Sequence, residues 1–293
     1  MIKWKGIVWT VHPLFVMVML ASLATGYMAE MMTLFLIVVV HELGHVMAAR
    51  SFGWTIREVK LLPFGGVAEA EEASGASAKE DALVAIAGPL QNGWMALAAW
   101  ACGWLGWWDG EWASYVVQAN LMIGLFNLLP IYPLDGGKLL QALFSLFVNF
   151  YGMLVWSSRI SLLLSVLMTA AAFAPLWLND DGVQLNLLVV GVFLTATNWN
   201  YARSVPFLFY RFLVHRGRLA DRESGRGRAV APLIVHAQQS IWSVARLFNR
   251  EKYHLVYVFD HAGKQLRVLP EQSIVGGCLS GLGPHRAVWE LLR

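Results

Sequence analysis

Val40-His41-Glu42-Leu43-Gly44-His45-Val46 lies inside an otherwise uncharged apolar run that extends from Met31 to Ala49. A run of this length matches the roughly 20 residues that a helix needs to cross a bilayer. Residues four apart share one face of a helix, so His41 and His45 lie one above the other with Glu42 beside the first. Charged groups at the centre of a span cost about 2.5–3.5 kcal/mol each and are rare without a partner or a function. The stretch therefore predicts a membrane helix that carries a chemical site.

This spacing is the HExxH pattern of zinc hydrolases. Neighbouring helical turns bring two imidazole nitrogens to about 2.1 Å from one Zn2+ ion, and the carboxylate can reach the water that the ion activates. We therefore expect His41 and His45 to be metal ligands and Glu42 to be the general base. The alternative is a pair of buried histidines bonded to backbone, and the cost of placing ionisable groups in a span argues against it.

The composition of the whole chain is that of a membrane protein. Of its 293 residues, 57% are hydrophobic and 14% are charged, whereas soluble domains contain about 25% charged residues. The first 202 residues contain 8 of the 22 Lys and Arg, and the remaining residues contain 14. A lipid-embedded region therefore precedes a soluble tail. The net charge of +3 is too small to indicate nucleic acid as a partner, and anionic lipid fits better.

Six apolar runs are long enough to cross a bilayer, and they cover residues 7–27, 31–49, 82–108, 115–134, 160–178 and 183–201. With six spans, the connections on one side contain acidic residues, whereas all 22 Lys and Arg fall on the other side. The positive-inside rule then places both termini in the cytoplasm. A further charge-free run, 139–156, carries one helical stripe of polar residues, which favours an interfacial or re-entrant segment over a seventh span.

A catalytic zinc ion needs a third protein ligand and an open fourth position. Asp135 is the candidate, because two prolines and two glycines break the helix in the surrounding segment, residues 127–137, and let an acidic side chain turn inward. An ordinary polar helix end is the alternative. The second and fourth runs cross in the same direction, so Asp135 and the two histidines reach the same depth. This agreement favours the ligand interpretation.

Three motifs resemble those of the site-2 protease family of intramembrane zinc metalloproteases. They are His41-Glu42-Leu43-Gly44-His45, Asn127 to Gly136 in the pattern NxxPxxxLDG, and Gly88-Pro89-Leu90-Gln91-Asn92 in the pattern GPxxN. The resemblance covers roughly residues 1–200. It implies a zinc-dependent peptidase in which His41, His45 and Asp135 bind the metal and Glu42 is the catalytic acid and base.

The short loop from Leu62 to Val67, the six-span layout and the small C-terminal module are most similar to a sporulation subgroup of this family. That likeness implies cleavage of a membrane-associated precursor of a sporulation sigma factor. It also implies that both termini lie on the mother-cell cytoplasm side and that partner membrane proteins inhibit the enzyme.

Five further positions are candidates for contacting substrate or ordering the site. We expect Asn92 to hydrogen-bond substrate or oxyanion and Asn127 to order the site, with buried polar contacts between helices as the alternative for both. Phe64, Gly65 and Gly66 lie in a short loop. This loop either dips into the membrane and pairs with an unwound substrate strand, or forms a plain turn.

The chain after Tyr201 begins with a basic segment, residues 203–230, which we expect to lie along anionic lipid as a linker. From 231 to 293 the pattern predicts a helix at 239–249, strands at 254–259 and 265–269, and a final helix. This order resembles a single cystathionine-beta-synthase (CBS) domain, which implies pairing between chains and an adenine nucleotide such as ATP as ligand. A passive docking domain is the alternative. Five histidines of the tail are expected to be solvated and to bind no metal: His215, His236, His254, His261 and His285.

The sequence thus predicts a mainly α-helical chain with a six-span membrane bundle (1–202), a basic linker (203–230) and a small α/β, CBS-like cytoplasmic domain (231–293). The expected function is an intramembrane zinc endopeptidase that cleaves a membrane-associated protein near the cytoplasmic face. A metal transporter or sensor would also place histidines and carboxylates in a span, but it would tolerate Glu42→Gln. A zinc hydrolase that acts on a lipid or small molecule would leave polypeptides intact.

Overall fold

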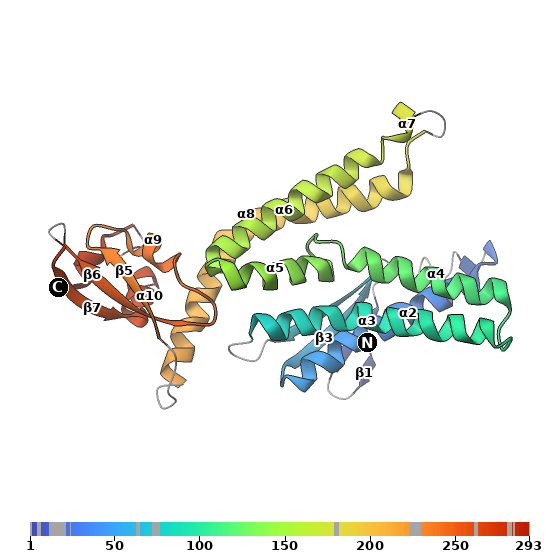
Figure 1. Cartoon of the computed structure of the whole chain (residues 1–293), viewed down its shortest axis with the longest axis horizontal. Helices are drawn as coiled ribbons and strands as arrows, with labels where there is room; N and C mark the ends of the chain where they lie inside the picture. The colour runs from blue at the N-terminus through green and yellow to red at the C-terminus, as the bar shows by residue number, and fades with distance from the viewer. Residues whose placement is uncertain are drawn as a thin grey trace. The chain divides into compact units, whose positions relative to one another are not determined.

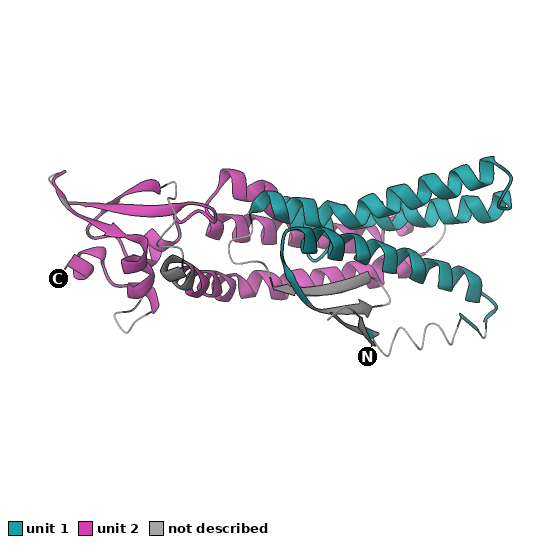
Figure 2. Ribbon diagram, turned by 90° about the horizontal axis from the view of Figure 1, so that it is seen from below, with its two compact units in different colours: residues 1–140 teal, residues 141–293 magenta. Residues whose placement is uncertain are grey.

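The computed structural model describes residues 2–4, 7–11, 22–23, 25–62, 65–71, 77–178, 182–222, 230–260, 263–279, 283 and 285–292. The chain is mainly helical and divides into two compact units, residues 1–140 and 141–293, coloured teal and magenta in Figure 2. Among the described residues, three helices are long and apolar enough to cross a membrane: α2 (Met28–Ser51), α3 (Ala78–Trp104) and α6 (Phe150–Ala171). These helices indicate a multi-pass membrane protein.

The first unit contains a small sheet as well as helices (Figure 1). The strands are β1 (Ile2–Trp4), β2 (Ile7–Val11), β3 (Thr55–Leu62) and β4 (Gly65–Glu71), hydrogen-bonded in that order. β2 pairs parallel to β3, and the other neighbours are antiparallel. The expectation of a membrane helix starting at residue 7 is therefore wrong for residues 7–11, whose β-branched and aromatic side chains favour a strand. The next part of that predicted span, residues 12–21, lies outside the described residues.

The helices α2, α3 and α4 (Gly110–Asn127) of the first unit pack against one another. Glycines let their backbones approach closely, because a Cβ atom at Gly44 would lie 2.7 Å from the carbonyl oxygen of Ala87. A Cβ atom at Gly124 would lie 3.2 Å from that of Asn92. Small residues at such contacts are typical of helices packed within membranes.

Capping residues place the starts of two of these helices before the predicted runs. α3 begins at Ala78, because the hydroxyl oxygen of Ser77 accepts a hydrogen bond from the backbone N–H of Glu80 at 3.2 Å. α4 begins at Gly110, where the carboxylate of Asp109 accepts bonds from the backbone of Glu111 and Trp112. Side chains of this kind satisfy the free N–H groups of a first helical turn.

The second unit contains a helical hairpin and a small α/β domain. α6 and α8 (Leu185–Arg222) pack along each other and are connected through the short helix α7 (Pro175–Leu178). Near this connection, the hydroxyls of Thr169 and Thr195 lie 3.1 Å apart. Residues 139–156, expected to form an interfacial or re-entrant segment, are divided between α5 (Asp135–Phe147) and the start of α6. Asn149 separates the two helices by capping the start of α6, since its side chain accepts a hydrogen bond from the N–H of Gly152 at 2.7 Å.

The C-terminal domain has a three-stranded sheet in the order β5-β6-β7. Its elements are β5 (Val230–His236), α9 (Ile241–Ala245), β6 (Tyr253–Phe259), β7 (Gln265–Pro270), α10 (Glu271–Leu279) and the 3-10 helix η1 (Val288–Leu292). β5 is parallel to β6, and β7 is antiparallel to it. The strands expected at 254–259 and 265–269 are present, whereas β5 was not predicted. The likeness to a CBS domain stays a prediction.

The domain shares its apolar core with the helical hairpin. Phe209 and Leu213 of α8 are completely buried in one cluster with Ile241, Val256 and Ile274 of the domain. α8 continues as a helix through residues 203–222, the first part of the basic segment. The domain and the ends of α6 and α8 are therefore packed together.

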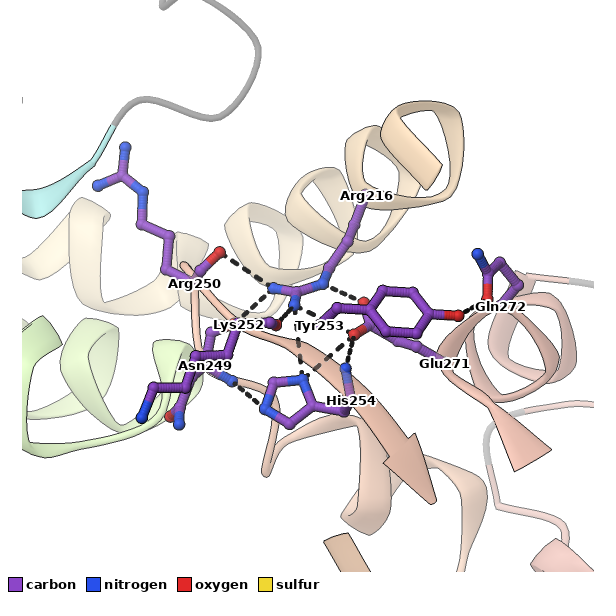
Figure 3. Close-up of polar contacts among 8 residues, drawn as sticks. All are labelled: Arg216, Asn249, Arg250, Lys252, Tyr253, His254, Glu271 and Gln272. Atoms are coloured by element: carbon purple, nitrogen blue, oxygen red, sulfur yellow. Dashed lines mark hydrogen bonds and ion pairs between the residues drawn. The ribbon is translucent and has the colours of Figure 1, made fainter. Parts of the chain in front are cut away.

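An ionic cluster connects α8 to the domain, and Figure 3 shows its residues. The guanidinium of Arg216 donates to both carboxylate oxygens of Glu271 and to the backbone carbonyls of residues 249, 250 and 252. His254 donates its backbone N–H to Glu271 at 2.9 Å, and its ring Nδ1 lies 3.2 Å from the same carboxylate. This arrangement pairs the charge of Arg216 with that of Glu271.

The prediction that His254 is solvated is wrong, because its exposed fraction is 0% and its ring stacks on Phe248. The sequence could not show this, since the two charged residues that surround His254 lie far from it in the chain. Of the other tail histidines, His215 and His285 are exposed and His236 is half-buried, while His261 lies outside the described residues.

We expect the C-terminal domain to loosen in acid. Burial alone would raise the pKa of Glu271, but hydrogen bonds from His254 and the charge of Arg216 outweigh it and hold the pKa below its ordinary value. A lowered pKa in the folded state contributes stability above the unfolded pKa, about 4.3, and this is lost as the pH falls through the folded pKa. The protection factors of the β6 amides in hydrogen–deuterium exchange should therefore fall below about pH 4. This fall should be smaller in Glu271→Gln, and an equal fall in both proteins would contradict the assignment.

Candidate metal centre

Two elements bring three donor atoms together in the first unit. α2 carries His41 and His45, whose Nε2 atoms lie 3.1 Å apart. The Oδ2 atom of Asp135, the first residue of α5, lies 3.1 Å from Nε2 of His41 and 3.0 Å from Nε2 of His45. All three side chains are buried. The donors thus form a nearly equilateral triangle.

Two glycines explain how Asp135 reaches α2. A Cβ atom at Gly136 would lie 2.2 Å from the carbonyl oxygen of Leu128, and one at Gly137 would lie 2.6 Å from the backbone nitrogen of Tyr132. Only glycine fits at such distances, so the chain can fold tightly back on itself after α4. The turn delivers the carboxylate to the histidines.

The donor set fits a zinc ion. Tetrahedral bonds of about 2.0–2.1 Å place ligand atoms about 3.3 Å from one another, close to the 3.0–3.1 Å sides of this triangle. Space beside the donors exists because residue 88 is glycine: a Cβ atom there would lie 2.3 Å from Nε2 of His45 and 2.7 Å from Nε2 of His41. One carboxylate and two imidazoles, with one position left for water, are the ligands of many catalytic zinc sites.

The remaining ring nitrogens of both histidines are hydrogen-bonded. Nδ1 of His45 lies 2.7 Å from the carbonyl oxygen of Val84, and Nδ1 of His41 lies 2.5 Å from the side-chain oxygen of Asn92. Such bonds hold the rings with Nε2 directed at a metal.

Two further charged groups lie at the site. Glu42 is buried, and its carboxylate lies with the ring nitrogens of His41 and His45 in a group whose atoms are within 4.8 Å of one another. Lys138 contacts the second oxygen of Asp135 at 3.4 Å. The arrangement therefore places a carboxylate that can accept a proton beside a set of three metal donors.

The other candidate positions, Asn127 and the loop glycines, take part in local backbone contacts. Asn127 donates to the carbonyl oxygen of Ile123 in its own helix at 3.0 Å. Gly65 and Gly66 begin β4 and pair with the end of β3, whereas Phe64 lies outside the described residues. Two residues were missed: Gly88 was recognised only as a motif letter, and Asn120 of α4 gave no signal beyond being polar in an apolar run.

Gly88→Ala is expected to weaken zinc binding by at least about 10- to 100-fold, the effect of removing support around a metal ligand. The added methyl group would force the ring of His45 to move, which withdraws Nε2 from Asp135. A competition titration with a chelator on the detergent-purified protein measures this. Gly93→Ala on the same helix is the matched control, because a Cβ there meets no described atom within 4 Å. Equal zinc affinity of the two variants would contradict the prediction.

Comparisons with known proteins identify the family of the chain. Residues 29–109 and 106–166 match Peptidase family M50. The chain is 33% identical to stage IV sporulation protein FB of Bacillus subtilis over 292 residues, which are 99% of this chain and 98% of that protein. It is 37% identical to zinc metalloprotease MJ0392 of Methanocaldococcus jannaschii over 118 residues, 38% of this chain and 33% of that protein.

A solved structure, the site-2 protease from Methanocaldococcus jannaschii, matches with a TM-score of 0.53 and 26% identity, covering 69% of this chain and 94% of that chain. The sequence similarity extends over nearly the whole chain, and the structural similarity over most of it. The chain therefore belongs to peptidase family M50 and is an intramembrane zinc metalloendopeptidase of the site-2 protease type.

Proposed function

We propose that this enzyme cleaves a membrane-associated protein near the cytoplasmic face of the membrane, and that the substrate is the precursor of a sporulation sigma factor. The main support for a peptidase site is the triangle of donor atoms from His41, His45 and Asp135, with Glu42 buried beside it. Similarity to stage IV sporulation protein FB over almost the entire chain supports the link to sporulation.

In this proposal His41, His45 and Asp135 hold one Zn2+ ion per chain. Zinc, when bound, polarises the scissile carbonyl and lowers the pKa of a coordinated water to about 7. Glu42 accepts the proton of the attacking water and passes it to the leaving amine. The buried surroundings strengthen these electrostatic interactions, because few solvent dipoles screen them.

The small sheet offers a place for the substrate backbone. β4 is an edge strand in the order β1-β2-β3-β4, and Gly65 and Gly66 form its beginning. An edge strand can bind an extended peptide through backbone hydrogen bonds. We assign to this edge, together with Phe64, the binding of an unwound substrate segment, and to Asn127 the ordering of the nearby turn.

The topology and the regulation of the enzyme follow from charge placement and from resemblance. The placement of Lys and Arg supports six spans with both termini in the cytoplasm. The basic segment 203–230, apart from Arg216, which is paired with Glu271, is assigned to anionic lipid. Partner membrane proteins inhibit the enzyme, and residues 231–293 pair with a second copy. Binding of ATP or another adenine nucleotide there rests on the resemblance to a CBS domain alone.

The test is cleavage of a membrane-associated sigma-factor precursor by the detergent-purified enzyme, followed by immunoblot and mass spectrometry. A shorter product that disappears on chelation and returns with zinc would support the proposal, and Glu42→Gln serves as the inactive control. An intact precursor would refute the substrate. Zinc uptake into proteoliposomes with an intact precursor would favour a transporter.

A further inference from the structure

A chain of buried amides extends from α4 through α3 to the first histidine of α2. Nδ2 of Asn120 donates to the carbonyl oxygen of Val116 at 2.9 Å. Nδ2 of Asn92 donates to Oδ1 of Asn120 at 3.2 Å, and Oδ1 of Asn92 lies 2.5 Å from Nδ1 of His41. The exposed fractions of Asn92 and Asn120 are 1% and 0%. The chain ends at an imidazole whose other nitrogen faces Asp135.

The carbonyl of Val116 fixes the direction of every bond in this chain, because a carbonyl oxygen only accepts. Asn120 must turn its NH2 group toward Val116, so its oxygen faces Asn92. Asn92 must then present its own NH2 group to Asn120 and its oxygen to His41. Since that oxygen only accepts, His41 carries its proton on Nδ1 and keeps the lone pair of Nε2 free.

We propose that Asn120 is a positioning residue, which sets the tautomer and the ring orientation of His41 through Asn92. The inference rests on the proposed role of His41 as a zinc ligand. Without Asn120, the amide of Asn92 can turn over and offer its NH2 group to Nδ1. The proton of His41 then moves to Nε2, the atom that must bind the metal.

The two histidines differ in how they are held, and this makes the role of Asn120 specific. Nδ1 of His45 bonds to the backbone carbonyl of Val84, which cannot turn over. His41 depends on a side-chain amide, so a second residue is needed to orient that amide. Gly124 lies one helical turn after Asn120 and lets α4 approach α3 closely. A Cβ atom at residue 124 would lie only 3.2 Å from the Cβ atom of Asn92.

The plainer alternative is that Asn120 and Asn92 only hold two membrane helices together. In that case replacing Asn120 lowers the stability of the protein and leaves the metal affinity of the folded fraction unchanged. Zinc affinity and the tautomer of His41 therefore separate the two explanations, whereas loss of activity alone would not.

The first measurement is the zinc affinity of Asn120→Leu, made in a Glu42→Gln background so that cleavage plays no part. We expect a fall of about 10- to 100-fold, as for other residues that orient metal ligands. Asn198→Leu is the matched control, because Asn198 is a buried asparagine of α8 that also bonds to the carbonyl four residues earlier, that of Leu194, at 2.8 Å. Equal affinity of the two variants would overturn the proposal.

The second measurement needs no variant at Asn120 and holds even if Asn120→Leu does not fold. In the metal-free protein with 15N-labelled histidine, His41, assigned by its absence in His41→Gln, should show the Nδ1–H tautomer. An Nε2–H tautomer would overturn the proposal. If this tautomer is found while the sigma-factor precursor stays intact, the proposed substrate fails and the role of Asn120 stands.

Discussion

Glu42→Gln is expected to lower the rate of substrate cleavage by about 10^2- to 10^4-fold, the usual contribution of a positioned general base. The amide has the shape of the carboxylate but cannot accept a proton at neutral pH. The three donors of the proposed zinc site are unchanged in this variant, so its zinc content should equal that of the wild type. Initial cleavage rates and metal analysis of the same purified samples measure both quantities.

Glu30→Gln provides the control for this result, because Glu30 lies in the first turn of the same helix, α2. It should cleave at the wild-type rate. If Glu42→Gln cleaved nearly as fast as the wild type, Glu42 would not be the base. If the variant lost its zinc, the slow rate would report a damaged metal site instead.

Glu271→Ala is expected to destabilise the C-terminal domain by about 3–5 kcal/mol, because it leaves the charge of a buried arginine without its partner. The side chains of Arg216 and Glu271 are 12% and 3% exposed, so water replaces little of what is lost. Cys278 reports the unfolding: it is buried, and burial raises the pKa of its thiol to about 11. Its labelling rate in increasing urea, in a Cys102→Ser background, gives the free energy of unfolding.

Glu290→Ala is the matched control for this variant. Glu290 pairs with Arg286 at 2.9 Å, but the arginine side chain is 62% exposed, and pairs at the surface contribute about 0–1 kcal/mol. A double change, Arg216→Met with Glu271→Leu, should recover much of the lost stability, because it removes both buried charges. Equal labelling of Cys278 in the two single variants would show that the buried pair contributes little.

Much of the proposed metal site follows from local sequence. The spacing of His41 and His45 places both on one helical face wherever that helix lies, and the glycines after Asp135 indicate a sharp turn. Asn120 shows the limit of this reasoning. Its partners come from another helix and from a backbone carbonyl, so its role appears only when α3 and α4 are packed.

The helices are also predictable in part, since long apolar runs overlap α2, α3, α4, α6 and α8, although α6 begins 10 residues before its run and α8 continues 21 residues beyond its run. The error at residues 7–11 has a physical cause. A short run of Ile, Val, Trp and Thr is equally apolar in a strand and at the start of a span. Pairing with β3, some 50 residues later in the chain, decides between them.

The shared core of α8 and the C-terminal domain limits the conclusions that can be drawn from a truncated enzyme. Ending the chain at residue 222 would expose Phe209 and Leu213, which are completely buried in the full-length protein. The shortened protein would then expose an apolar surface and tend to aggregate. An inactive truncation would therefore say little about regulation, and point changes on the outer surface of the domain are the sounder way to study it.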